Sequence, residues 1–231
     1  GLSFDIADAR VHPVPVLPEI TGGQGMGQLA GHALSIGVTS ARMAAPDGAL
    51  LDALAHADPI LSEGGDPSLE QAWEALTLAS GVMDPDAVRE EFDALFIAIG
   101  TPPVNPYGSR YLSGFMNDAP LAALRGDLAR FGIGRVRGVA EFEDHLGALC
   151  ETMRVLIAGA PGIPRQPLDE QKRIFSTHIQ PWYATCLADI AGAEPANFYR
   201  VVAAFAGAFL GVEALAFAMW QPADTDTPIA A

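Results

Sequence analysis

The chain has 231 residues, of which half are apolar and 18% are charged, so a disordered chain is excluded and one large or two small folded domains are expected. The formal net charge is −15, from 28 acidic and 13 basic residues, and Lys172 is the single lysine. Phosphates of nucleic acids and of anionic lipids would repel such a chain, whereas a basic partner would be attracted. The same charge would also be explained by solubility alone.

Signals for the start and end of helices repeat along the chain, and no segment shows the alternation typical of a β-strand. Residues 1–28 contain many prolines and glycines and predict an extended or mobile arm. Residues 29–231 predict a single all-α domain of about eight or more helices. The predicted helices are 26–45, 48–57, 68–80, 86–99, 121–131, 142–158, 168–192 with an interruption at Pro181, and a last helix that Pro195 opens.

Two segments interrupt this succession of helices. The first is the loop 100–111, GTPPVNPYGSRY. The second, 158–167, predicts a hinge between an N-terminal part, 29–157, and a C-terminal part, 168–220. A monomer and a dimer that swaps domains at this hinge are both compatible with the sequence.

The segment 201–220, VVAAFAGAFLGVEALAFAMW, is long and apolar enough to cross a bilayer. Alanine and glycine make up much of it, Glu213 would lie deep in hydrocarbon, and no basic residue follows it closely. We therefore favour a core helix surrounded by other helices, with a membrane-anchored subunit as the alternative.

The segment 141–153, EFEDHLGALCETM, combines acids and a histidine with an apolar stripe. On a helix, Glu141 and His145 share a face, and Asp144 stands beside them at the exposed edge. A carboxylate next to a histidine would raise the pKa of the histidine, as in a general base. A cluster that caps the helix and a surface that binds a partner are the alternatives.

The sequence contains no G-x-S-x-G nucleophile motif, no metal-ligand spacing such as C-x-x-C or H-E-x-x-H, and no phosphate or dinucleotide loop. We therefore expect a protein that is not an enzyme and holds neither metal nor cofactor, with a small enzyme that uses an Asp/His pair as the alternative. The arginines at 125, 130, 135 and 137 could meet an anion or could be a solvated helix face.

Three stretches in order, EFDALFIAIGTPPVNPYGSRYL, EFEDHLGALCETM and IFSTHIQPWYATC, resemble motifs of the TorD/DmsD/NarJ family of molybdoenzyme maturation chaperones. The resemblance covers about 85–220. The chain departs from the family pattern at three places. Phe142 replaces the proline of the E-P-x-D-H signature, Leu149-Cys150 stands where that signature has Glu-Leu, and Gly108 replaces the usual acid between tyrosine and serine in the loop.

The resemblance implies an all-helical cytoplasmic chaperone that binds the catalytic subunit of a molybdoenzyme, often at a twin-arginine leader, before export or assembly. Carboxylates can bind the guanidinium groups of such a leader, and aromatic rings can stack on them. For Tyr107, Trp182 and His178, ordinary packing in the core is the alternative to a binding role. The residues that the resemblance assigns to client binding are Glu141, Asp144, His145, Tyr107, Ser109, Tyr111, His178, Pro181 and Trp182.

Overall fold

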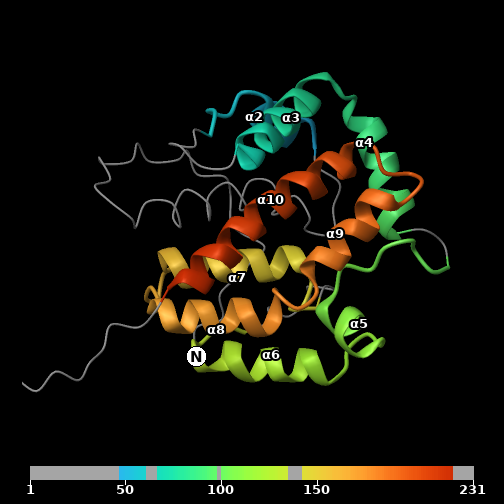
Figure 1. Ribbon diagram of the computed structural model, residues 1–231. Coiled ribbons are helices and arrows are strands. Elements are labelled where there is room, and N and C mark those ends of the chain that lie inside the picture. Colours follow the sequence, from blue (N-terminus) through green and yellow to red (C-terminus); the bar gives the residue numbers. More distant parts are fainter. Residues whose placement is uncertain (1–46, 61–66, 98–99, 135–141, 221–231) are drawn as a thin grey trace, which may run out of the picture.

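The computed structural model describes residues 47–60, 67–97, 100–134 and 142–220 (Figure 1). The predicted arm 1–28, the predicted helix 26–45 and Glu141 lie outside these ranges. Within them the structure contains helices, two isolated β-bridges and no strand, which confirms the all-α prediction. The helices are α2 (Gly48–Ala55), α3 (Ser68–Val82), α4 (Pro85–Phe92), the π-helix η2 (Asp93–Ile97), α5 (Gly108–Ser113), α6 (Ala119–Arg130), α7 (Leu146–Ala158), α8 (Leu168–His178), α9 (Tyr183–Gly192) and α10 (Phe198–Met219).

Most of these helices begin and end close to the prolines, glycines and capping residues that predict their bounds in the sequence. Asp84 caps α4, because its side chain accepts a hydrogen bond from the Asp86 amide, and Pro85 occupies the first turn. Pro181 lies in the turn that separates α8 from α9. The prediction that α3 ends before Gly81 is wrong by two residues. A Cβ at Gly81 would lie 3.4 Å from the Cβ of Ala55, so the glycine lets α2 approach α3 closely while the helix continues.

Helix α10 is the central element of the fold. It packs against α9, α3, α4 and α8, with α2 and α3 on one side of it and α7 and α8 on the other (Figure 1). Aromatic side chains mark these interfaces: the Trp73 and Phe205 ring centroids lie 5.1 Å apart, and those of Phe175 and Phe217 lie 5.2 Å apart. Among the described residues, α10 is the one helix whose length and composition would suit a membrane span. One face of α10 packs against these neighbours, but Leu215 and Met219 are 65% and 77% exposed, so the predicted core helix is buried only in part.

A buried carboxylate connects two segments that lie far apart in the sequence. Glu91 on α4 accepts hydrogen bonds from the backbone amides of Asn197, Phe198 and Tyr199, at 2.8, 2.9 and 2.7 Å. These amides belong to the first turn of α10 and have no partner within their own helix. A negative charge also suits the positive end of a helix dipole. Glu91 therefore fixes the start of the central helix against α4.

The predicted hinge 158–167 is a compact connection between α7 and α8. Ala160 and Ile163 form an isolated bridge, and Gly159 and Gly162 adopt positive φ angles of 80° and 78° that other residues rarely adopt. The Gln166 amide donates to the Leu156 carbonyl at 2.8 Å, which ties the connection back to α7. The two parts on either side of it, and its role as a hinge, stay predictions.

Candidate functional site

Asp144 and His145 lie in a turn before α7 and not on the exposed edge of a helix. Their exposed fractions are 3% and 6%, so the prediction of an exposed helical position is wrong. One Asp144 carboxylate oxygen, Oδ2, accepts from the Ser109 amide at 2.7 Å, and the Asp144 carbonyl accepts from the Gly108 amide at 2.8 Å. The Leu146 amide donates to the Pro106 carbonyl at 2.9 Å. This turn is therefore a junction that joins the start of α5 to the start of α7.

His145 caps α7, because its ring nitrogen Nδ1 accepts a hydrogen bond from the Gly147 amide at 3.1 Å. Burial lowers the pKa of His145 to about 4, so the ring is neutral near pH 7. Burial outweighs any effect of a neighbouring carboxylate on this pKa, and His145 shows the capping role that the sequence left open as an alternative to a general base. No hydrogen bond joins the Asp144 and His145 side chains in the described part of the chain, so the geometry does not form an acid–base pair.

Three other residues of the predicted site support this junction from the inside. Tyr107 packs edge-on against His145, with ring centroids 5.1 Å apart. Ser109 is fully buried, and its hydroxyl accepts from the Asn117 amide at 3.2 Å. Trp182 is 2% exposed, and its indole nitrogen donates to the His178 carbonyl at 2.6 Å. For Tyr107 and Trp182 the structure shows the core packing that the sequence left as an alternative.

The indole of Trp182 also explains why a glycine stands at position 108, where the family usually has an acid. A Cβ built at Gly108 would lie 3.1 Å from Nε1 of Trp182, so any side chain there would require the tryptophan to shift. The glycine thus lets α5 begin directly against Trp182.

Tyr111 is the predicted residue that reaches the surface from this buried group. Its ring stacks on Trp182, with centroids 5.4 Å apart and planes 19° from parallel, and its hydroxyl donates to Asp189 on α9 at 2.8 Å. Exposed apolar side chains follow Tyr111 in the chain. We call this region the α5 surface and define it as Tyr111, Leu112, Phe115, Met116 and Asp189.

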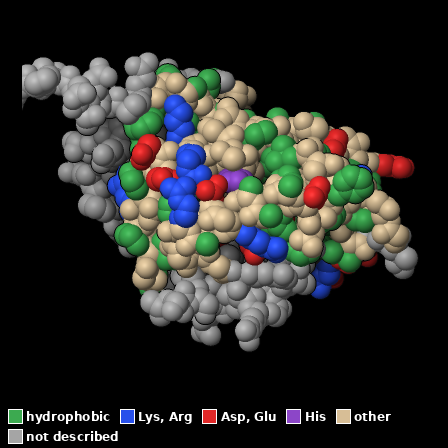
Figure 2. Space-filling model, turned by 90° about the horizontal axis from the view of Figure 1, so that it is seen from below, with side chains coloured by type: hydrophobic (Ala, Val, Ile, Leu, Met, Phe, Trp, Pro, Cys, Tyr) green, Lys and Arg blue, Asp and Glu red, His purple; other side chains and the backbone are tan. Residues whose placement is uncertain are grey.

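The face of the molecule in Figure 2 is mixed in character. Green apolar side chains gather on its right, with isolated red acidic side chains among them, while a compact group of blue and red side chains occupies its left (Figure 2). Leu112, Phe115 and Met116 are 42%, 72% and 38% exposed and stand within five residues of one another in the chain. Exposed apolar side chains that form a contiguous patch often mark a binding surface. The chain therefore presents apolar and acidic groups to solvent close together.

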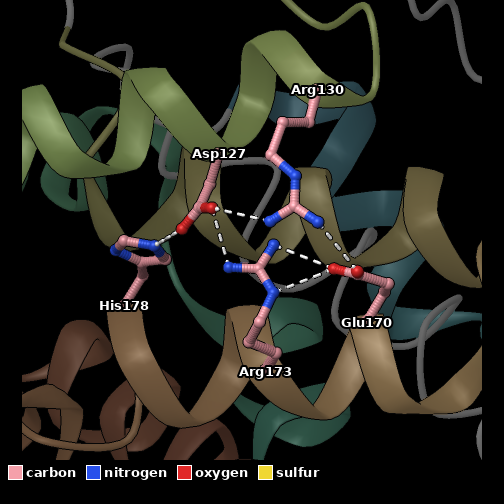
Figure 3. Close-up of polar contacts among 5 residues, drawn as sticks. All are labelled: Asp127, Arg130, Glu170, Arg173 and His178. Atoms are coloured by element: carbon pink, nitrogen blue, oxygen red, sulfur yellow. Dashed lines mark hydrogen bonds and ion pairs between the residues drawn. The ribbon is translucent and has the colours of Figure 1, made fainter.

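His178 belongs to an ion-pair network between α6 and α8 (Figure 3). Its Nε2 lies 2.8 Å from one carboxylate oxygen of Asp127, and Arg173 binds the other oxygen at 2.7 Å. Partial burial would raise the pKa of Asp127, but the hydrogen bonds from His178 and Arg173 outweigh it and lower that pKa. Glu170 pairs with both Arg130 and Arg173, so the network is internally neutralised and holds two helices together.

The structure thus brings together most, but not all, of the predicted site. Asp144, His145, Tyr107 and Ser109 meet at the junction, and Trp182 links that junction to Tyr111 at the surface. Pro181 is exposed in the turn before α9, one residue from Trp182. The sequence reasoning missed Asp189, which stands seven residues after Trp182 and hence two helical turns along the same face.

The described residues give little support to an anion site or a metal site. Arg125 binds both carboxylate oxygens of Glu143, at 2.8 to 3.1 Å, and Arg130 pairs with Glu170 at 3.0 Å. Arg135 and Arg137 lie outside the described ranges. Within those ranges, no three His, Cys, Asp or Glu side chains stand close enough together to hold a metal ion.

Two comparisons with known proteins agree with the motifs. Residues 62–188 match the family model described as "Nitrate reductase delta subunit". The chain is 28% identical over 144 residues to a protein named "Chaperone protein TorD" from Aeromonas salmonicida (strain A449). That alignment spans 60% of this chain and 64% of the relative, which is less than two thirds of the relative's length. Because the family match covers more than half of the chain, the protein belongs to the nitrate reductase delta subunit family, the TorD/DmsD/NarJ family that its motifs resemble.

Proposed function

We propose that the protein is a chaperone that binds the catalytic subunit of a dimethyl-sulfoxide-reductase-class molybdoenzyme and assists its assembly and cofactor insertion. Family membership and the name of the TorD relative support this function. The chaperone would act as a cytoplasmic binding protein and not as an enzyme. The neutral, capped His145 and the Asp144 carboxylate bound to a backbone amide support the absence of acid–base catalysis at this position.

The α5 surface is the part of the molecule that we propose contacts the client. A twin-arginine leader offers two guanidinium groups followed by an apolar segment. Asp189 is exposed and supplies a carboxylate, and the Tyr111 ring lies beside it, held from behind by Trp182. Guanidinium groups bind carboxylates and stack on aromatic rings, while Phe115 and Met116 can cover apolar side chains. This combination of an acid, a supported ring and exposed apolar groups is the observation that carries the proposal.

Asp144 and His145 have a positioning role in this proposal. Both side chains are buried, so they do not contact a client directly. They can affect binding only by fixing the positions of the helices that they bind. Asp144 binds the first turn of α5 and His145 caps α7, so together they determine where α5 sits. Ser109, Tyr107 and Trp182 complete the support, and Pro181 ends the turn on which Trp182 stands. His178 supports Trp182 through its carbonyl.

The proposal is tested by titrating the full chain with a synthetic peptide that contains an Arg-Arg pair followed by an apolar run. The same peptide with Lys-Lys is the comparison, because lysine cannot form the planar bidentate contact. We expect Asp189→Asn to weaken binding of the Arg-Arg peptide about threefold to tenfold, in line with a partly exposed charge-assisted contact. Glu74→Gln on α3 changes the net charge equally at an exposed site and should leave affinity unchanged.

Equal losses in both variants would show that only overall charge matters and would contradict the α5 surface as the binding site. A chain that binds neither the leader peptide nor a molybdoenzyme catalytic subunit produced without its cofactor would contradict the chaperone function itself.

A further inference from the structure

Helix α10 has an apolar face that the described helices leave uncovered. Leu215 and Met219 on this face are 65% and 77% exposed, and Ala204 and Ala218 are exposed as well. Spacings of three or four residues place these side chains on one side of the helix. We call this side the α10 face and define it as Ala204, Ala208, Gly211, Leu215, Ala218 and Met219. Over about four helical turns it contains no polar side chain.

An uncovered face of this composition is unusual for a helix at a protein surface, which normally turns a polar stripe toward water. The opposite side of α10 packs against α3, α8 and α9, and Glu213 is the one charged residue between Val201 and Met219. A helix that is apolar on nearly all sides is typical of a protein core. A Cβ built at Gly211 meets no atom of another described element within 4 Å, whereas glycine inside a helix is favoured where another backbone approaches closely. The α10 face therefore lacks a cover among the described residues.

The predicted helix 26–45, which lies outside the described ranges, has the complementary pattern. Its apolar side, read from the sequence at spacings of three or four residues, consists of Met26, Ala30, Leu34, Val38 and Ala41. The other side consists of Gln28, His32, Ser35, Thr39 and Arg42. Three glycines weaken this helix on its own, so it requires a surface on which to bury its apolar side.

The chain attaches this segment close to the α10 face. Only Pro46 separates it from Asp47, the N-cap of α2, and a Cβ built at Gly48 would lie 3.6 Å from Cγ of Pro85 at the start of α4. Glu91, which binds the start of α10, stands about 9 Å further along α4. As a helix the segment would be about 30 Å long, and the α10 face extends over about 22 Å. The segment is therefore tethered near the start of α10 and is long enough to cover the whole face.

We propose that the segment 26–45 packs as an amphipathic helix on the α10 face, antiparallel to α10, with Leu34 and Val38 at the contact. The inference goes beyond the proposed function and does not depend on it. The antiparallel direction follows from the tether, because the segment ends near the start of α10 and must run along the helix from there. Arg42 stays on the solvent side, so no charge enters the contact. A bilayer suits the face less well, since the net charge of −15 opposes contact with anionic lipid.

Cysteine reactivity in the full chain measures whether the α10 face is covered. Leu215→Cys places a thiol on this face, and Leu78→Cys places one on α3, where Leu78 is 66% exposed, so the two sites are equally open among the described residues. The native Cys150 and Cys186 are buried and give a slow background. Each rate of alkylation by N-ethylmaleimide is divided by the rate in urea, which removes differences in the intrinsic reactivity of the thiols. We expect the alkylation of Leu215→Cys to be about tenfold or more slower than that of Leu78→Cys, because it must wait for local opening.

Two substitutions within the segment identify what covers the face. Leu34→Asp puts a charge on the apolar side, which is costly to bury, so it should raise the alkylation rate of Leu215→Cys to within about twofold of that of Leu78→Cys. Thr39→Asp adds the same charge on the polar side and is the matched control, in which alkylation should stay slow. The native cysteines should stay unreactive in both variants, which shows that the core remains folded.

Equal alkylation rates for Leu215→Cys and Leu78→Cys would overturn the proposal, and so would slow alkylation that Leu34→Asp does not relieve. Protection that weakens on dilution would assign the face to a second copy of the chain, and protection that appears only with phosphatidylglycerol vesicles would assign it to a bilayer; either result overturns the proposal. A slower rate at Leu78→Cys would place the segment on α3 and overturn it as well. If Leu215→Cys does not fold, Met219→Cys and Val82→Cys form a second pair, at positions that are 77% and 74% exposed, with the same expected results.

Discussion

The neutral state of the buried His145 ring makes the stability of the protein depend on pH. Its pKa is lowered from 6.5 to about 4 by burial, so the unfolded chain takes up a proton at a higher pH than the folded chain does. The contribution to stability is therefore complete above pH 6.5 and is lost as the pH falls from 6.5 through 4. The loss should reach about 3 kcal/mol at its acid end.

His145→Asn tests this dependence. Asparagine is a favourable capping residue, so it can accept from the Gly147 amide, yet it does not titrate. We expect the variant to be less stable at pH 7 because the smaller side chain leaves space in the core. Its free energy of unfolding, measured in urea between pH 4 and 7, should vary less steeply than that of the unmodified chain. An unchanged slope would assign the acid sensitivity to another group.

Glu213 on α10 should have the opposite effect. Burial raises its pKa from 4.5 to about 7, so the folded chain favours the protonated acid. The stability that this group contributes is complete below pH 4.5 and is lost as the pH rises through 7. Glu213→Gln keeps the shape without the charge. It should raise the free energy of unfolding by about 1–3 kcal/mol at pH 8 and leave it nearly unchanged at pH 4, as measured by urea denaturation. A gain of equal size at both pH values would argue against titration.

At the scale of the helices, the contact between Glu91 and the start of α10 is the most testable. Removing the carboxylate with Glu91→Ala leaves three backbone amides of a buried first turn without their acceptor. Hydrogen bonds to charged groups contribute more than neutral ones, so we expect a loss of about 2–4 kcal/mol in the free energy of unfolding. Glu90→Ala, at the exposed neighbouring position, should cost less than about 0.5 kcal/mol. Equal losses would mean that helix propensity, and not the contact with α10, explains the effect.

Helices were the part of the fold that the sequence predicted best. Asp-Pro pairs, prolines and apolar stripes fix helix starts through local chemistry, and α4, α6, α8 and α9 begin close to the predicted residues. The turn at 142–145 was predicted as helix because Phe142 continues the apolar stripe of α7 by spacing alone. Its actual conformation depends on hydrogen bonds to Pro106, Gly108 and Ser109, which are distant in sequence.

The same reason limits what could be predicted of the candidate site. The motifs correctly brought Asp144, His145, Tyr107 and Ser109 together, but motifs do not report burial, so Asp144 and His145 were expected at the surface. Asp189 was missed because it belongs to no motif and acts only through Tyr111, 78 residues earlier in the chain. The structural role of Glu91 was missed because the amides that it binds lie 106 to 108 residues away in the sequence.

At the scale of the whole molecule, the net charge of −15 should control how fast a basic client associates. Long-range attraction raises association rates, and salt screens it within about 8 Å at physiological ionic strength. We expect the association rate of the Arg-Arg peptide, measured by stopped-flow fluorescence, to fall about tenfold between 0.05 and 0.5 M salt, while the dissociation rate changes little. A rate independent of salt would show that the charge serves solubility only.

The position of α10 also has a consequence for synthesis of the chain. Glu91 and its partner Asn197 are 106 residues apart, and α3 likewise meets α10 only across a long separation. As the chain emerges from the ribosome, α2, α3 and α4 therefore appear well before the helix that covers them. Contacts between such distant segments form slowly, and apolar surface that waits for its partner is prone to aggregate. A protein proposed to shield an unfinished client would therefore itself fold late during synthesis. The apolar surfaces of its N-terminal helices would stay exposed until α10, which ends at Met219, has been synthesised.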